Sequence, residues 1–147
     1  MVDACRLRSM LDRLRGTEGE LDRLRALGTA QVREDPDRLN SVKYLFVLAA
    51  EVAIDAGQHV IATEGLAAPK TFADVFHQLG HAGWVEAELA AALADLARFR
   101  NLLVHGYADV DDDRVLEILH SDALTDLARL REALTSHALD GPSGSPR

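Results

Sequence analysis

One nine-residue stretch holds the side chains best suited to chemistry, Phe99-Arg100-Asn101-Leu102-Leu103-Val104-His105-Gly106-Tyr107. An arginine guanidinium is planar and always charged, so Arg100 can hold a phosphodiester and offset the charge that develops on its oxygens. A histidine titrates near neutral pH, so His105 can take the proton of a ribose 2′-hydroxyl or protonate the leaving 5′-oxygen. The pair suits RNA cleavage without a metal. The structural alternative is that His105 caps carbonyl groups and that Arg100 only forms an ion pair.

Other groups of reactive side chains in the sequence are incomplete. His77 and His81 stand four residues apart, as two zinc ligands on one helical face would, but no glutamate follows His77 and no third ligand is evident. The acidic run from Asp109 to Asp113 lacks the glycine and the distal glutamate of an EF-hand loop, so we expect Asp111 or Asp112 to cap a helix instead. We therefore expect structural or surface roles for these residues and predict no metal and no cofactor.

The composition predicts one globular, all-α domain. The chain has 147 residues, of which 48% are hydrophobic, 27% are charged and 5% are aromatic, with helix-favouring residue types dominant. Sixteen Lys and Arg residues against 24 Asp and Glu residues give a net charge of −8. Such a charge excludes a protein that coats DNA through its overall field, so any nucleic-acid binding must come from a local basic site.

The sequence favours the cytoplasm. Cys5 is the only cysteine, so no intramolecular disulfide and no cysteine-rich zinc site can form. The N-terminal residues lack the apolar core of a signal peptide, and the longest apolar stretch, Tyr44 to Ala56, is short and interrupted by Glu51 and Asp55. We therefore expect neither secretion nor a membrane span.

Apolar spacing and helix-capping residues predict the elements that must position the motif. Leucines from Leu7 to Leu27 recur at threes, fours and sevens and indicate a first helix, which Glu34-Asp35-Pro36-Asp37 ends. Asp37 would cap the second helix, Glu64-Gly65-Leu66 would end it, and Thr71 would cap the third. The expected later helices run from about Arg38 to Ala62, from Phe72 to Leu79, from Glu86 to Val104, and from Asp111 or Asp112 to near His137.

The first helix also carries many arginines, among them Arg8 and Arg15. Aspartates and glutamates lie between these arginines, so the local surplus of positive charge is slight. We therefore favour a solvent-exposed face with intrahelical ion pairs, and an RNA-binding patch is the alternative.

The motif and its flanking segments resemble a known family. The spacing Arg100-x4-His105-x-Tyr107 matches the R-x4-H-x-Y signature of HepT toxins, which are small HEPN-fold ribonucleases of type VII toxin–antitoxin pairs. The similarity extends from about Leu39 to Leu130 and includes the segments Ala53-Ile54-Asp55, Glu64-Gly65-Leu66, Ala68-Pro69-Lys70 and Phe72-Ala73-Asp74. The N-terminal helix and the C-terminal tail are the less familiar parts.

The resemblance implies an antiparallel, up-and-down helical bundle of the HEPN type that forms a two-fold homodimer. Residues 1–138 would form this single domain, and residues 139–147 would be a disordered tail. Arg100 and His105 of both subunits would line a shared cleft. Physical chemistry favours the same arrangement, because one histidine serves as base or as acid, whereas a symmetric pair supplies both.

The resemblance also implies the activity and its control. We expect a metal-independent endoribonuclease that cuts cellular RNA, not DNA, and leaves a 2′,3′-cyclic phosphate. A cognate nucleotidyltransferase antitoxin of the MntA type would transfer AMP from ATP to Tyr107. The added anion would block the path of the RNA and compete for Arg100. Asn101 would position the substrate or, alternatively, only cap the helix.

A noncatalytic role is the alternative that the sequence leaves open. HEPN-like bundles also serve as docking partners of nucleotidyltransferases, and Arg100 and His105 would then bind nucleotide or partner. Growth arrest on expression of the chain alone would distinguish a ribonuclease from a docking module.

Overall fold

Helices account for most of the described chain. The computed structural model describes residues 3–106 and 109–140, and these contain seven α-helices, a terminal π-helix and no strand. The predicted all-α fold class is confirmed. The elements are, in order, α1 (Ala4–Ala26), α2 (Thr29–Glu34), α3 (Pro36–Thr63), α4 (Phe72–His81), α5 (Ala87–His105), α6 (Asp112–Leu119), α7 (Ala123–Leu134) and the π-helix Thr135–Asp140.

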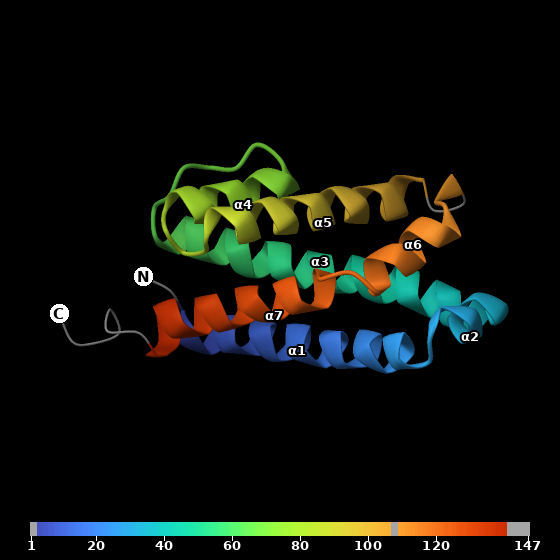
Figure 1. The fold of residues 1–147 in the computed structure, drawn as a ribbon. Coiled ribbons are helices and arrows are strands. Elements are labelled where there is room, and N and C mark those ends of the chain that lie inside the picture. Colours follow the sequence, from blue (N-terminus) through green and yellow to red (C-terminus); the bar gives the residue numbers. More distant parts are fainter. Residues whose placement is uncertain (1–2, 107–108, 141–147) are drawn as a thin grey trace.

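The four longest helices form an antiparallel bundle. Helix α1 packs against α3 and α7, and α5 packs against the same two helices from the other side. Neighbouring helices of this ring run in opposite directions along the bundle (Figure 1). The expected up-and-down bundle is therefore confirmed. The short helix α4 lies outside the ring and packs along α3 and α5.

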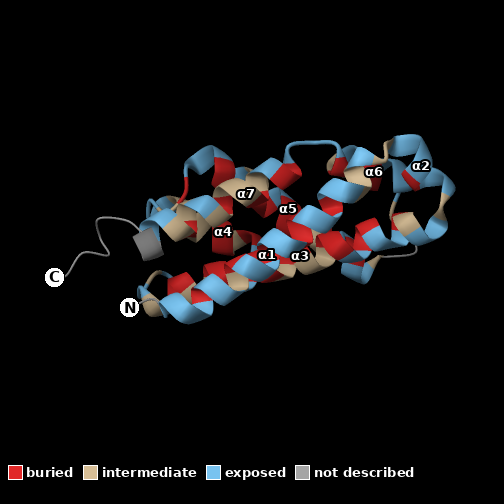
Figure 2. Cartoon of the chain, turned by 90° about the horizontal axis from the view of Figure 1, so that it is seen from below, coloured by how far each residue is buried: buried red, intermediate tan, exposed pale blue. Residues whose placement is uncertain are grey.

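Helix α3 is the central element of the core. Its buried residues include Phe46, Ala49, Ala53 and Val60, and Figure 2 shows that the buried residues of the long helices face the interior of the bundle. By length and composition alone α3 could cross a membrane, but 61% of its apolar window is buried inside the protein. That is the environment of a core helix, so the apolar run is explained by packing.

Close packing of α4 onto α3 depends on a glycine. A Cβ atom at Gly57 of α3 would lie 2.6 Å from Cγ1 of Val75 in α4. Such a distance is a steric clash, so glycine allows α4 to approach the central helix. This approach also holds Phe72, the first residue of α4, beside Arg100 near the end of α5.

Three predicted helix ends are confirmed by their hydrogen bonds. Gly65 has a φ of 66° after the end of α3, and the N–H of Leu66 donates to the carbonyl of Ile61 at 3.0 Å. This is the hydrogen bond of a Schellman cap. The side chain of Thr71 accepts from the N–H of Asp74 at 3.0 Å and starts α4. Asp111 likewise accepts from the N–H of Asp113 at 2.9 Å and starts α6.

Two predictions about the N-terminal helices are wrong. The first helix ends at Ala26, because Gly28 takes a φ of 88° and the chain then forms the separate helix α2. The cap of α3 is Asp35 and not Asp37. The Asp35 side chain accepts from the N–H of Asp37 at 3.0 Å, and Pro36 occupies the first helical turn, where its missing N–H costs nothing.

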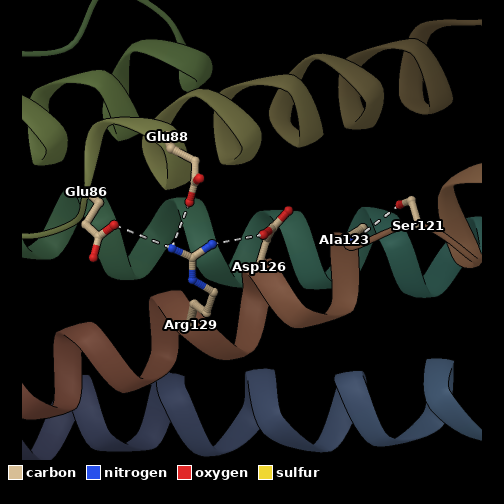
Figure 3. A network of polar contacts seen from close by, with 6 residues as sticks. All are labelled: Glu86, Glu88, Ser121, Ala123, Asp126 and Arg129. Carbon is tan, nitrogen blue, oxygen red and sulfur yellow. Dashed lines mark hydrogen bonds and ion pairs between the residues drawn. The ribbon is translucent and has the colours of Figure 1, made fainter.

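The predicted last helix is divided in two. Helix α6 ends at Leu119, and the side chain of Ser121 accepts from the N–H of Ala123 at 3.2 Å, where α7 begins (Figure 3). The π-helix then continues the chain to Asp140, beyond the expected end near His137. Residues 141–147 lie outside the described residues, so the domain boundary at residue 138 stays a prediction.

Ion pairs join the helices of the bundle at their flanks. Arg131 of α7 donates from Nε and Nη2 to the buried Glu18 of α1, at 3.0 and 2.9 Å, and this hydrogen bonding raises the pKa of Arg131. Arg129 of α7 donates to Glu88 of α5 at 3.0 Å and lies 3.7 Å from Asp126 (Figure 3). These contacts join α7 to α1 on one flank and to α5 on the other.

Candidate functional site

Three of the four predicted site residues line one cavity at the C-terminal end of α5. Asn101 and His105 stand four residues apart and so share a helical face, and the long side chain of Arg100 reaches the same place. The cavity has a volume of about 410 Å³ and opens to solvent. The fourth predicted residue, Tyr107, lies outside the described residues. The cavity is lined by Gln58 of α3, Pro69, Lys70 and Thr71 of the connection, Phe72 of α4, and Arg100, Asn101 and His105.

The end of α5 is held in place by its apolar side. Phe99 and Leu103 are buried in the core, and Phe99 packs edge-on against Phe46 of α3 with ring centroids 5.8 Å apart. The helix ends where the N–H of Gly106 donates to the carbonyl of Leu102 at 2.8 Å. The polar residues of the motif therefore project from a rigid helix end.

Arg100 is fixed by contacts on several sides. Its Nη2 donates to Oε2 of Glu51 in α3 at 2.8 Å, and its Nη1 donates to Oδ1 of Asn101 at 3.0 Å. The guanidinium carbon lies 5.1 Å from the centroid of the Phe72 ring. The side chain is 14% exposed, and its buried Nε has no hydrogen-bond partner among the described residues. The guanidinium is therefore preorganised, with an unused donor.

The cavity is a local basic site in an acidic chain. Lys70 and Arg100 carry positive charge, His105 is exposed, and none of the described residues that line the cavity is acidic. By contrast, the cavity between α1 and α7 places Asp12 and Glu132 among its arginines. The site at the end of α5 is thus suited to an anionic ligand such as a phosphodiester.

The connection before α4 is tied to the helix next to the cavity. The N–H of Lys70 donates to Oδ2 of Asp74 at 3.0 Å, and this bond lowers the pKa of the Asp74 carboxyl. The carboxylate also receives a weaker hydrogen bond from Gln78 at 3.5 Å. Lys70 is therefore held at a defined place on the rim of the cavity.

Large apolar side chains are exposed beside the motif. Leu102 is 61% exposed and Val104 is 44% exposed, both on the last turns of α5. Tyr44, on the neighbouring helix α3, is 63% exposed. Exposed apolar groups around a polar site are typical of a surface that contacts another molecule.

The other candidates from the sequence do not form sites of this kind. Among residues 3–106 and 109–140, no three potential ligands from His, Cys, Asp and Glu gather as a metal site would require. Of the acidic run, Asp111 caps α6, Asp112 pairs with Lys43 at 2.9 Å, and Asp113 pairs with Arg33. In the arginine-rich helix α1, an exposed ion pair joins Arg23 to Glu20 at 3.6 Å.

Glu51, Phe72 and Lys70 contribute to the site but were not predicted from the sequence. Glu51 interrupts the apolar stretch from Tyr44 to Ala56, and a charged residue within such a stretch is the one signal that the sequence offers for it. Phe72 and Lys70 gave no signal by type or spacing, because their role depends on where α4 lies relative to α5.

Comparisons with known proteins identify relatives of the whole bundle. The sequence model of the HepT-like family, whose description is ribonuclease HepT-like, matches residues 15–134. This range includes the motif. No curated protein sequence matches the chain significantly.

Several solved structures share the fold. A toxin–antitoxin complex with AMP-PNP matches with a TM-score of 0.81 at 19% identity, over 88% of this chain and 96% of the other. A tri-AMPylated HEPN toxin from Shewanella oneidensis in complex with an MNT antitoxin matches with a TM-score of 0.81 at 20% identity, over 92% and 98%. YutE from Bacillus subtilis, a cytosolic protein of unknown function, matches with a TM-score of 0.76 at 19% identity, over 95% of both chains.

Proposed function

The chain belongs to the HepT-like ribonuclease family, and on this basis we propose that it is the toxin of a toxin–antitoxin pair that acts in the cytoplasm as a metal-independent endoribonuclease. The observation that carries the proposal is the cavity in which Arg100, Asn101 and His105 meet without an acidic lining residue among those described. Such a cavity supplies a fixed positive charge, a neutral hydrogen-bonding group and an imidazole that can accept or donate a proton.

The proposed reaction is an internal transesterification. A histidine accepts the proton of the ribose 2′-hydroxyl, and the 2′-oxygen attacks the adjacent phosphorus. Arg100 binds the non-bridging oxygens and stabilises the charge that develops on them. The bond to the 5′-oxygen then breaks as that oxygen receives a proton, which leaves a 2′,3′-cyclic phosphate and a 5′-hydroxyl. Asn101, which already holds Nη1 of Arg100 at 3.0 Å, orients the guanidinium and the substrate.

The proposed active form is a two-fold homodimer. The exposed Leu102 and Val104 lie within the motif, between Arg100 and His105, so pairing of two α5 ends would bury these apolar groups and bring two His105 side chains together. One histidine could then act as base while its counterpart acts as acid. Two copies of Arg100 would also strengthen the positive field that draws RNA to an acidic protein.

The proposed control is AMPylation of Tyr107 by a cognate nucleotidyltransferase antitoxin. Two features support it: Tyr107 follows His105 by two residues, and the structural relatives include a tri-AMPylated HEPN toxin in complex with an MNT antitoxin. An AMP group beside His105 would add negative charge where the RNA phosphate must bind. It would therefore compete for Arg100 and close the site by bulk.

Expression of the chain alone in a bacterial host tests this function. Growth should stop on induction, continue when the antitoxin is expressed with the chain, and continue for Arg100→Ala and His105→Ala. His120→Ala is the matched control, because His120 is exposed after α6 and outside the cavity, and it should remain toxic. Harmless expression of the unaltered chain would favour the noncatalytic docking role instead.

A further inference from the structure

Phe72 is an aromatic side chain left exposed inside a polar, cationic cavity. It is the first residue of α4 and is 38% exposed, whereas the following apolar residues Ala73, Val75 and Phe76 are buried in the core. The same cavity is lined by Arg100 and His105. Packing of the core therefore does not explain why an aromatic residue occupies this position.

Local hydrogen bonds hold Phe72 in place. The cap at Thr71 fixes the first turn of α4, and the bond from the N–H of Lys70 to Asp74 fixes the residue two positions earlier. The backbone of Phe72 is thus fixed on both sides in the sequence, and the guanidinium of Arg100 contacts the ring itself. A preorganised aromatic ring loses little conformational entropy when a ligand stacks on it.

Arg100 contacts the ring but does not cover it. The guanidinium carbon lies 5.1 Å from the ring centroid, within the range of a cation–π interaction. Despite this contact, Phe72 is 38% exposed as a residue, and it lines the cavity. A planar group that entered the cavity could therefore stack on Phe72 while its attached phosphate reached Arg100.

We propose that Phe72 is the stacking platform for an unpaired nucleobase next to the phosphodiester at Arg100, and that the Lys70 ammonium binds a neighbouring phosphate. This inference rests on the proposed ribonuclease function and adds a preference for single-stranded RNA. Stacking on an aromatic side chain requires an unstacked base, which single strands and loops provide. The cationic lining favours RNA over an apolar protein segment as the occupant of the cavity.

Binding of a non-cleavable RNA tests the platform separately from catalysis. The probe is a single-stranded 2′-O-methyl oligonucleotide that carries one 2-aminopurine, whose fluorescence is quenched when the base stacks. The full-length protein should bind and quench this probe. Phe72→Leu should weaken binding about tenfold and abolish the quenching, whereas Phe72→Trp should retain both. Lys70→Ala should weaken binding and reduce its dependence on salt.

Two controls isolate the stacking contact. Tyr44→Leu removes an aromatic side chain that is more exposed than Phe72, at 63% against 38%, and lies outside the cavity, so it should leave the quenching unchanged. Replacing the 2-aminopurine nucleotide by an abasic one should remove the difference in affinity between the unaltered protein and Phe72→Leu, because no base is left to stack.

The outcomes separate the two proposals. Unchanged affinity and quenching in a folded Phe72→Leu variant, or no binding of the probe by the unaltered protein, would overturn the platform. If Phe72→Leu left RNA binding intact but weakened binding of the antitoxin, Phe72 would be a protein contact and the inference would be wrong. Quenched binding by a protein that cuts no RNA would support the platform and reject the ribonuclease.

Discussion

Arg100 of α5 donates a hydrogen bond from Nη2 to Oε2 of Glu51 in α3 over 2.8 Å. The two residues are 49 positions apart in the sequence, and their contact joins the two helices. The Glu51 side chain is 44% exposed and that of Arg100 is 14% exposed. The carboxylate of Glu51 is thus the more solvent-accessible partner, and it holds the mostly buried guanidinium of Arg100 in place. It orients Arg100, and it also offsets part of the positive charge that a phosphate would meet.

Glu51→Gln should separate orientation from charge. Glutamine can still accept a hydrogen bond from Arg100 but carries no charge, so the bond that orients the guanidinium weakens while the cavity becomes more positive. We expect kcat for RNA cleavage to fall about tenfold, which corresponds to about 1.4 kcal/mol, while KM stays equal or decreases. Steady-state kinetics with a short RNA measure both constants. An increase in KM with unchanged kcat would argue against a positioning role for Glu51.

Leu102→Glu should dissociate the proposed dimer. Leu102 is 61% exposed in the single chain, so a carboxylate at this position should leave the bundle itself unaffected. In the proposed dimer the same carboxylate would be buried at the interface without a partner. We expect a monomer by light scattering and a loss of RNA cleavage of about 100-fold or more. Gln31→Glu on the exposed side of α2 adds the same charge outside α5 and outside the cavity, and it should leave the dimer intact. A fully active Leu102→Glu monomer would refute the composite site.

Tyr107→Phe should escape control by the antitoxin. The substitution removes only the hydroxyl that would receive AMP, so the protein should keep its toxicity. Incubation with the antitoxin and ATP should increase the intact mass of the unaltered protein by one or more AMP groups and leave the mass of Tyr107→Phe unchanged. Modification of the variant to the same extent would place the acceptor elsewhere.

Asp126→Asn should stabilise the bundle near neutral pH. Burial raises the pKa of the Asp126 carboxyl above its ordinary value of 3.8, and Arg129 at 3.7 Å only partly opposes this effect (Figure 3). The folded state thus binds the proton more tightly than the unfolded state, so stability falls as the pH rises from about 4 through the raised pKa. The Asp126→Asn variant has no carboxyl group at this position, so its stability does not fall with rising pH in this way.

Thermal unfolding at several pH values measures the effect of Asp126→Asn. We expect a gain of less than about 1 kcal/mol at pH 7 that shrinks as the pH falls toward 4. Glu117→Gln, at an exposed position of α6, serves as the control for simple removal of a surface charge. A variant that is less stable than the unaltered protein at pH 7 would mean that the contact with Arg129 outweighs the cost of burial.

The elements that sequence reasoning predicted well are those with strong local signals. The leucine spacing of α5, the Thr71 cap and the glycine after α3 each act within a few residues, so their geometry follows from neighbouring side chains. The errors have local causes as well. Gly28 breaks an apolar stripe that continues through α2, and Asp35 and Asp37 both have side chains suited to a cap.

The candidate site was predictable only in part. Arg100, Asn101 and His105 share one helix end, so their meeting follows from the sequence. Phe72 of α4 lines the same cavity, whereas Glu51 of α3 does not line it but contacts Arg100. Both contacts depend on how the helices pack, including the close approach permitted by Gly57. Phe72 has no signal in residue type or spacing, and the only signal for Glu51 is that it is a charged residue within an apolar stretch.

Cleavage of a defined RNA by the purified protein tests the central claim most directly. The reaction is run in excess EDTA, and the products are identified by mass spectrometry. We expect the unaltered protein to leave a 2′,3′-cyclic phosphate and a 5′-hydroxyl, and Arg100→Ala and His105→Ala to remain dimeric and folded but to cut about 100-fold or more slowly. Cleavage by both variants at the rate of the unaltered protein, or cleavage abolished by EDTA, would contradict a metal-independent site built from Arg100 and His105.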